Sequence, residues 1–168
     1  MATQHARPLR CYAYVNRPYD AVRTLLHARP VELLHAATTS AAARAKDVAG
    51  NLRVAAAGVE LGVQVDLRVL GVQDEEGIAG LSPVTRANIA WQAARAPTLF
   101  PLMEAKLSAW PLTSTETQLE IEGEYTAPLG PVGAAIDAAI GHRIAEAAVH
   151  RFVDDVAEQI RHEIPSKA

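Results

Sequence analysis

Four side chains with metal-ligand chemistry recur at every fourth position near the C-terminus: His142, Glu146, His150 and Asp154. On a helix, residues four apart lie on one face, so neighbouring pairs could share a divalent metal. The whole row cannot converge on one ion, because its ends lie about 18 Å apart at a rise of about 1.5 Å per residue. A solvated helix face explains the spacing better. We therefore expect no metal site and no cofactor.

Two charged pairs and one thiol are the other candidates for catalytic chemistry. Asp66 and Arg68 share one face of a predicted strand, and Glu104 and Lys106 share a face of another. Pairing across strands at a solvated surface accounts for both. The single cysteine, Cys11, lies in a predicted strand, where such a residue is typically a small buried apolar side chain. No known catalytic motif is present, so the sequence predicts no catalytic residues and leaves enzymatic activity open.

Histidine and aromatic side chains offer candidates for lining or guarding a cavity. His27 and His35 each fall on one of two predicted short helices. Trp91 falls on the apolar face of its strand, whereas Trp110 falls on a polar face and suggests an edge or interface position. The hydroxyl of Tyr125 could bond a ligand or cap the following turn, since a buried tyrosine normally finds a polar partner.

Composition favours an ordinary globular protein of one domain, residues 1–168. The chain has 168 residues, 49% of them apolar, and a net charge of −3. Its arginines are scattered, so nothing indicates nucleic acid as a partner. One cysteine allows no intrachain disulfide, and neither a secretory signal nor a stretch of about 18 apolar residues is visible. We expect a cytoplasmic protein without an integral membrane segment.

Hydrophobic periodicity predicts an α+β order of elements. A strand at residues 9–15 is followed by two short helices near 18–37 and a helical or irregular connector at 38–50. A hairpin with arms at 52–57 and 59–72 comes next, and strands at 85–93, 102–112 and 117–125 continue it as an antiparallel meander. In the second hairpin arm, Val59 to Val69 alternate without a break between an apolar and a charged face.

The last predicted element, residues 131–163, is a long helix with one apolar stripe. The stripe repeats every four residues: Val132, Ile136, Ile140, Ile144, Ala148, Phe152, Val156 and Ile160. The apolar face of the meander offers a surface to cover this stripe, while Glu120, Glu122 and Glu124 point to water. We therefore predict a curved antiparallel sheet of six or seven strands that grips the helix.

The segment between the last strand and the helix carries a more specific pattern, GEYTAPLGPVGAAID. A Gly-x-Tyr segment ends the strand, a Pro-Gly corner follows, and an aspartate comes early in the helix: Gly123, Tyr125, Pro128, Gly130, Gly133 and Asp137. With the order of elements, this resembles the START/birch-pollen-allergen superfamily (SRPBCC, helix-grip), in particular its polyketide cyclase/dehydrase-like and uncharacterised bacterial members. The resemblance implies an internal cavity for lipids, polyketides or similar molecules, in which some members catalyse reactions and many only bind.

We accordingly expect the chain to bind or carry a hydrophobic small molecule between sheet and C-terminal helix. An enzyme of the polyketide cyclase, aromatase or hydrolase-like kind is the alternative, and a partner-binding subunit without ligand is a second one; a homodimer stays open. The apolar faces of strands and helix supply the expected ligand-binding residues: Val65, Leu67, Ile89, Trp91, Met103, Leu107, Leu119, Ile121, Tyr125, Ile136 and Ile140.

Overall fold

The computed structural model describes residues 7–38, 65–76, 82–93, 103–125 and 138–165. In chain order, its elements are β1 (Arg7–Val15), α1 (Tyr19–Ala28), a second short helix over residues 30–38, β2 (Val65–Glu75), β3 (Val84–Ala93), β4 (Met103–Pro111), β5 (Thr117–Tyr125) and α4 (Ala138–Glu163). The predicted first hairpin arm, the start of the second arm and residues 131–137 lie outside these described ranges.

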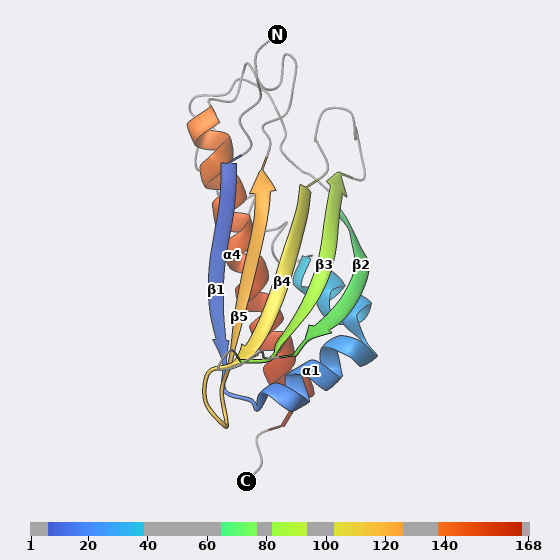
Figure 1. The fold of residues 1–168 in the computed structure, drawn as a ribbon. Helices are drawn as coiled ribbons and strands as arrows, with labels where there is room; N and C mark the ends of the chain where they lie inside the picture. The colour runs from blue at the N-terminus through green and yellow to red at the C-terminus, as the bar shows by residue number, and fades with distance from the viewer. Residues whose placement is uncertain (1–6, 39–64, 77–81, 94–102, 126–137, 166–168) are drawn as a thin grey trace.

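The five described strands form one antiparallel sheet in the order β1-β5-β4-β3-β2. Strands β2 to β5 follow one another as the predicted meander, and β1 joins the sheet beside the last strand. Helix α4 lies along one face of the curved sheet, where it packs against β1 and β5, and the two short helices lie toward the β2 side (Figure 1). This is the predicted α+β helix-grip arrangement.

Strand β2 departs from the predicted alternation at Leu70. Its register against β3 shifts between Val69 and Gly71, so Leu70 is an extra, exposed residue in a β-bulge. Because a shift by one residue exchanges the two faces of a strand, Val72 and Asp74 take inward positions beyond the bulge. The bulge follows directly after the predicted alternation, which ends at Val69, and the strand runs on to Glu75, into the segment predicted as a polar turn.

The core lies between the sheet and the helices. The described part of the predicted stripe on α4 is confirmed, since Phe152, Val156 and Ile160 are fully buried. Neighbouring small and branched residues widen that stripe: Val149, Val153 and Ala157. Helix α1 adds three buried side chains to the same core: Val22, Leu25 and Leu26.

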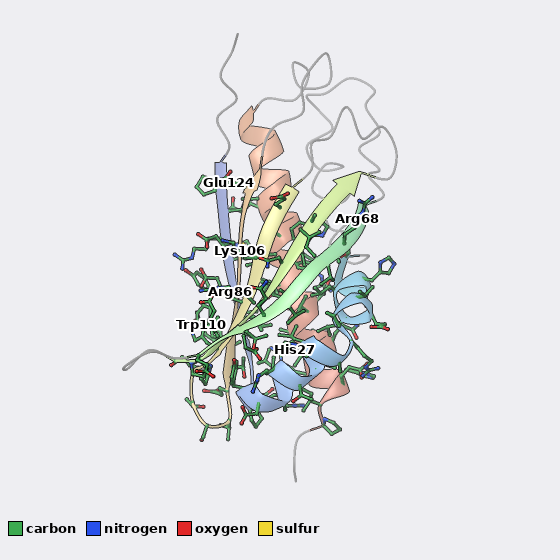
Figure 2. The ribbon with its side chains drawn as sticks, turned by 45° about the vertical axis from the view of Figure 1, so that its right-hand side comes forward. His27, Arg68, Arg86, Lys106, Trp110 and Glu124 are labelled. Atoms are coloured by element: carbon green, nitrogen blue, oxygen red, sulfur yellow. The ribbon has the colours of Figure 1, made fainter. Side chains whose placement is uncertain are left out.

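The outer face of the sheet is polar, but less uniformly solvated than predicted. Figure 2 shows Lys106, Glu124 and Trp110 on this face, away from α4. Glu120 was expected to point to water with its neighbours, yet it is buried beneath an ion pair with Arg10. Trp110 is half-buried on β4, an inner strand of the described sheet, so the edge position predicted for it is wrong.

Arg17 joins the end of β1 to the end of α4. Its side chain is buried and donates to the backbone carbonyls of Ile164 and Arg161, the latter at 3.1 Å. A cation at the C-terminal end of a helix is stabilising, because the last carbonyls lack partners within the helix and carry partial negative charge. Thr117 of β5 donates to the Arg17 carbonyl at 2.8 Å, so three elements meet at this residue.

Candidate ligand-binding site

The inner face of the sheet is an apolar surface that continues across all five described strands. Cross-strand pairing arranges its side chains in rows, one of which contains Cys11, Ile121, Leu107, Ala87 and Val72. The next row contains Leu9, Gly123, Ala105, Ile89 and Val69. Every member on β1, β4 and β3 is buried, whereas the β2 members of both rows are only partly buried.

The second row has its smallest side chains at its centre, where Gly123 of β5 pairs with Ala105 of β4. A Cβ placed on Gly123 would lie 2.8 Å from the Cβ of Ala105 and 3.0 Å from the carbonyl oxygen of Glu104. Contacts this short do not occur between carbon atoms, so only glycine fits at this close approach of β4 and β5.

Six of the expected ligand-binding residues have described side chains on this inner face or beside it. Ile89, Leu107, Leu119 and Ile121 are at most 1% exposed and belong to the core cluster. Trp91 is 9% exposed and meets Phe152 of α4 edge to face, with ring centroids 5.0 Å apart. Leu67 on β2 is partly buried against the same core.

The remaining expected residues are described by backbone alone or not at all. Val65, Met103 and Tyr125 occupy positions in β2, β4 and β5, and Ile140 lies in α4, but their side chains fall outside the described residues. Ile136 precedes α4 and lies outside the described ranges. Register places Met103 opposite Trp91, and therefore on the inner-face side of β4.

A polar cluster that the sequence did not indicate lies at the α1 end of this face. Asp74, turned inward by the β2 bulge, accepts hydrogen bonds from Arg23 and Thr85, each at 2.8 Å, and lies 3.0 Å from His27 Nε2. The buried hydroxyl of Tyr19 lies 2.8 Å from Thr85 Oγ1. His27, labelled in Figure 2, projects from α1, which this cluster fastens to β2 and β3.

The electrostatics of Asp74 favour a structural role. Desolvation raises the pKa of its carboxyl group, but hydrogen bonds from His27, Arg23 and Thr85 outweigh this effect and lower that pKa overall. A carboxylate stabilised in its charged form by three neighbours is a weak proton acceptor, so we assign Asp74 the role of an anchor and not of a general base.

Cys11 does not have the environment of a nucleophile. It is 1% exposed on the inner face of β1, and burial, with the nearby charges of Glu146 and Asp154, raises the pKa of its thiol to about 11. A buried thiol of raised pKa remains protonated and unreactive near neutral pH.

The other candidates from the sequence are exposed where they are described. Glu146, His150 and Asp154 lie on the solvated side of α4, and the side chain of His142 falls outside the described residues. Among the described residues, no group of three or more His, Cys, Asp or Glu side chains is placed to hold a metal ion. His35 is exposed on the second short helix.

The two charged pairs take different places. Arg68, Glu104 and Lys106 are exposed at outward register positions of the sheet. Figure 2 shows Lys106 on the side opposite α4. The side chain of Asp66 falls outside the described residues, although its backbone pairs with Gln92. The described members thus form part of a solvated strand surface, as expected for cross-strand pairing.

Comparison with known proteins finds similarity in fold only. No protein-family model matches the chain, and no curated protein matches it. Among solved structures, norcoclaurine synthase from Thalictrum flavum matches with a TM-score of 0.48 and 9% identity over 99% of each chain. An aromatase/cyclase from Streptomyces sp. R1128 matches with a TM-score of 0.45 and 16% identity, over 95% of this chain and 97% of that one.

A START superfamily protein from Mycobacterium smegmatis is similar as well, with a TM-score of 0.46 and 9% identity over 95% of this chain and 100% of that chain. Likenesses this distant assign no activity and no binding residues. None of the helices within the described residues is long and apolar enough to cross a membrane.

Proposed function

We propose that the protein binds a hydrophobic small molecule between the inner face of the sheet and α4. The observation that carries this proposal is the extent of the apolar inner face. Helix α4 packs against β1 and β5, whereas Leu67, Val69 and Val72 continue the apolar surface to the far side of the sheet, where they are only partly buried. Apolar surface that remains accessible beside a core favours an apolar ligand.

The aromatic contact between sheet and helix marks where such a ligand would meet the core. Trp91 and Phe152 join β3 to α4 edge to face, and Leu67 pairs with Trp91 across the neighbouring strand. A molecule that extends from Leu67 and Val69 toward α4 would contact Trp91 first. The proposed wall comprises the residues expected from the sequence: Val65, Leu67, Ile89, Trp91, Met103, Leu107, Leu119, Ile121, Tyr125, Ile136 and Ile140.

A comparison of the two tryptophans tests this proposal. Trp91→Phe should weaken the binding of an apolar dye, such as a naphthalene sulfonate, because it changes the proposed wall. Trp110→Phe is the matched control: the same substitution on the outer face should leave the affinity of the dye unchanged. Binding is measured by titrating the fluorescence of the dye. If both variants bind the dye with the affinity of the original protein, the site does not lie beside Trp91. If the dye binds to none of the three proteins, the proposal fails.

A further inference from the structure

Asp155 is a buried acid whose burial neither the core nor the proposed binding of an apolar molecule explains. It is 6% exposed, and one carboxylate oxygen, Oδ1, lies 2.8 Å from the guanidinium of Arg151. The other oxygen, Oδ2, is buried and has no hydrogen-bond partner among the described residues. Native proteins satisfy nearly all buried polar atoms with protein, water or ligand, because an unpaired one costs free energy.

Asp155 lies on the flank of α4 that meets the proposed wall through Phe152. The buried stripe of the helix runs from Phe152 at one flank to Ala157 at the other. At about 100° per residue, Asp155 lies about 60° outside the Phe152 flank and Asp154 about 60° outside the Ala157 flank. The charge of Asp154 helps to raise the pKa of the Cys11 thiol, so Asp154 lies on the flank of α4 toward β1. Asp155 lies on the opposite flank, on which Phe152 reaches Trp91.

The two neighbouring aspartates thus occupy mirrored positions with opposite exposure. Asp154 is exposed on the Ala157 flank of α4, whereas Asp155 is buried on the Phe152 flank. Arg151 already balances the charge of Asp155, and its own side chain is half-exposed. What Oδ2 lacks is therefore a hydrogen-bond donor and not a second counter-charge.

We propose that Asp155 Oδ2 accepts a hydrogen bond from a neutral hydroxyl group on the bound hydrophobic molecule. The ligand class is then an apolar body that carries an alcohol or phenol, such as a hydroxylated lipid or polyphenol. This inference rests on the proposed function and adds the polar group by which the site distinguishes hydroxylated molecules from plain hydrocarbons. A hydroxyl bound without such a partner would lower affinity, because its desolvation is unfavourable.

Three naphthalene probes of similar size test this inference by calorimetry or fluorescence: ethylnaphthalene, naphthalenemethanol and naphthylmethylamine. The original protein should bind naphthalenemethanol roughly tenfold more tightly than ethylnaphthalene, as one well-placed hydrogen bond to a charged acceptor allows. Asp155→Leu should abolish this preference while keeping the affinity for ethylnaphthalene, which also reports that the variant is folded. Asp154→Leu, the same change on the exposed flank, should keep the preference.

A second variant covers the event that Asp155→Leu does not fold. In Asp155→Asn, the amide oxygen can keep the contact with Arg151, and the NH2 group then replaces Oδ2. This NH2 group can only donate to the alcohol oxygen, and such a neutral hydrogen bond is weaker than one to a carboxylate, so the preference for the alcohol should shrink. If Asp155→Leu or Asp155→Asn leaves the preference unchanged, Asp155 does not recognise the hydroxyl, and the proposed function stands without it. If naphthylmethylamine binds more tightly than the alcohol, the site selects a cation and the assignment is overturned. If no probe binds, the proposed function fails together with this inference.

Discussion

Individual polar residues are where the structure adds most to the sequence. Glu120 alternates with Leu119 and Ile121 as any solvent-facing residue would, yet Arg10 covers it. Asp74 follows a run of valines and leucines and has the appearance of a turn residue, yet it accepts hydrogen bonds from two other elements. Each case involves a partner distant in sequence, since Arg10 lies 110 positions from Glu120 and Arg23 lies 51 positions from Asp74. Periodicity carries no information on such pairings.

Asp74 should make the stability of the protein sensitive to acid. Folding lowers the pKa of its carboxyl group, so its contribution is complete above the pKa of an unfolded aspartate, about 3.9, and is lost as pH falls below that value. Asp74→Asn should therefore be less stable than the original protein near neutral pH, and the difference should shrink between about pH 5 and pH 2. Urea unfolding at several pH values measures this.

His27→Gln is the matched variant for this prediction, because glutamine can still donate a neutral hydrogen bond to Asp74. It should lose less stability than Asp74→Asn at neutral pH. Parallel loss of stability by the original protein and Asp74→Asn over the whole acid range would show that Asp74 gains nothing from its neighbours.

Phe152 should be the most costly core side chain of α4 to truncate. It is 1% exposed and its ring meets Trp91 edge to face. Phe152→Ala should lower the free energy of unfolding by roughly 3–5 kcal/mol, because the truncation leaves a cavity as well as removing apolar contact. Trp91→Phe keeps an aromatic ring at the contact and should cost much less. Equal losses in urea unfolding would make Trp91 ordinary core and weaken its place in the proposed wall.

At the scale of elements, hydrophobic periodicity predicted the strands and the long helix but not the irregularity within β2. The strands and the long helix are strongly periodic, and β1, β3, β4, β5 and α4 lie where the sequence placed them, within the described residues. The bulge at Leu70 was not predictable, because Val69, Leu70 and Val72 are all apolar and fit either face. The first short helix was predicted to begin near residue 18, and α1 begins at Tyr19 with Pro18 as its N-cap residue.

An added methyl group should destabilise the sheet at one of its glycines and have little effect at another. Gly123→Ala would place a Cβ 2.8 Å from that of Ala105, so it should lower the free energy of unfolding by roughly 1–3 kcal/mol through overpacking. Gly71→Ala meets no atom within 4 Å and should be close to neutral. Adding Ala105→Gly to Gly123→Ala should restore part of the loss. Thermal and urea unfolding decide the matter, and equal effects at both glycines would contradict the close approach.

Arg17 should hold the last turn of α4 against the end of β1. Arg17→Met keeps much of the apolar stem but leaves the carbonyls of Arg161 and Ile164 without their donor, so we expect a loss of roughly 1–3 kcal/mol. Hydrogen exchange should become faster in the last turn of α4 and stay unchanged in its middle. Arg17→Lys should rescue little, because an ammonium group lacks the planar fork that reaches both carbonyls. Unchanged exchange in the last turn would refute this role.

For the molecule as a whole, the order of elements was enough to predict the helix-grip arrangement. Contiguous strands with short turns imply a meander, and one long amphipathic helix needs the apolar face of that sheet. The pairing of β1 with β5 places the first and last of the described strands side by side at one edge of the sheet, which no local pattern indicates. The site was less predictable, because the same apolar residues serve equally as packed core and as cavity wall.

The central claim is that this molecule binds a hydrophobic small molecule, and native mass spectrometry of the purified protein tests it most directly. Gentle ionisation should show the chain with an added mass of a few hundred daltons, and organic extraction should release an apolar compound that denatured protein no longer carries. Loss of the added mass in Trp91→Phe but not in Trp110→Phe would place the compound at the proposed wall. Protein that remains without any added mass after incubation with a mixed lipid and polyphenol extract would contradict the claim.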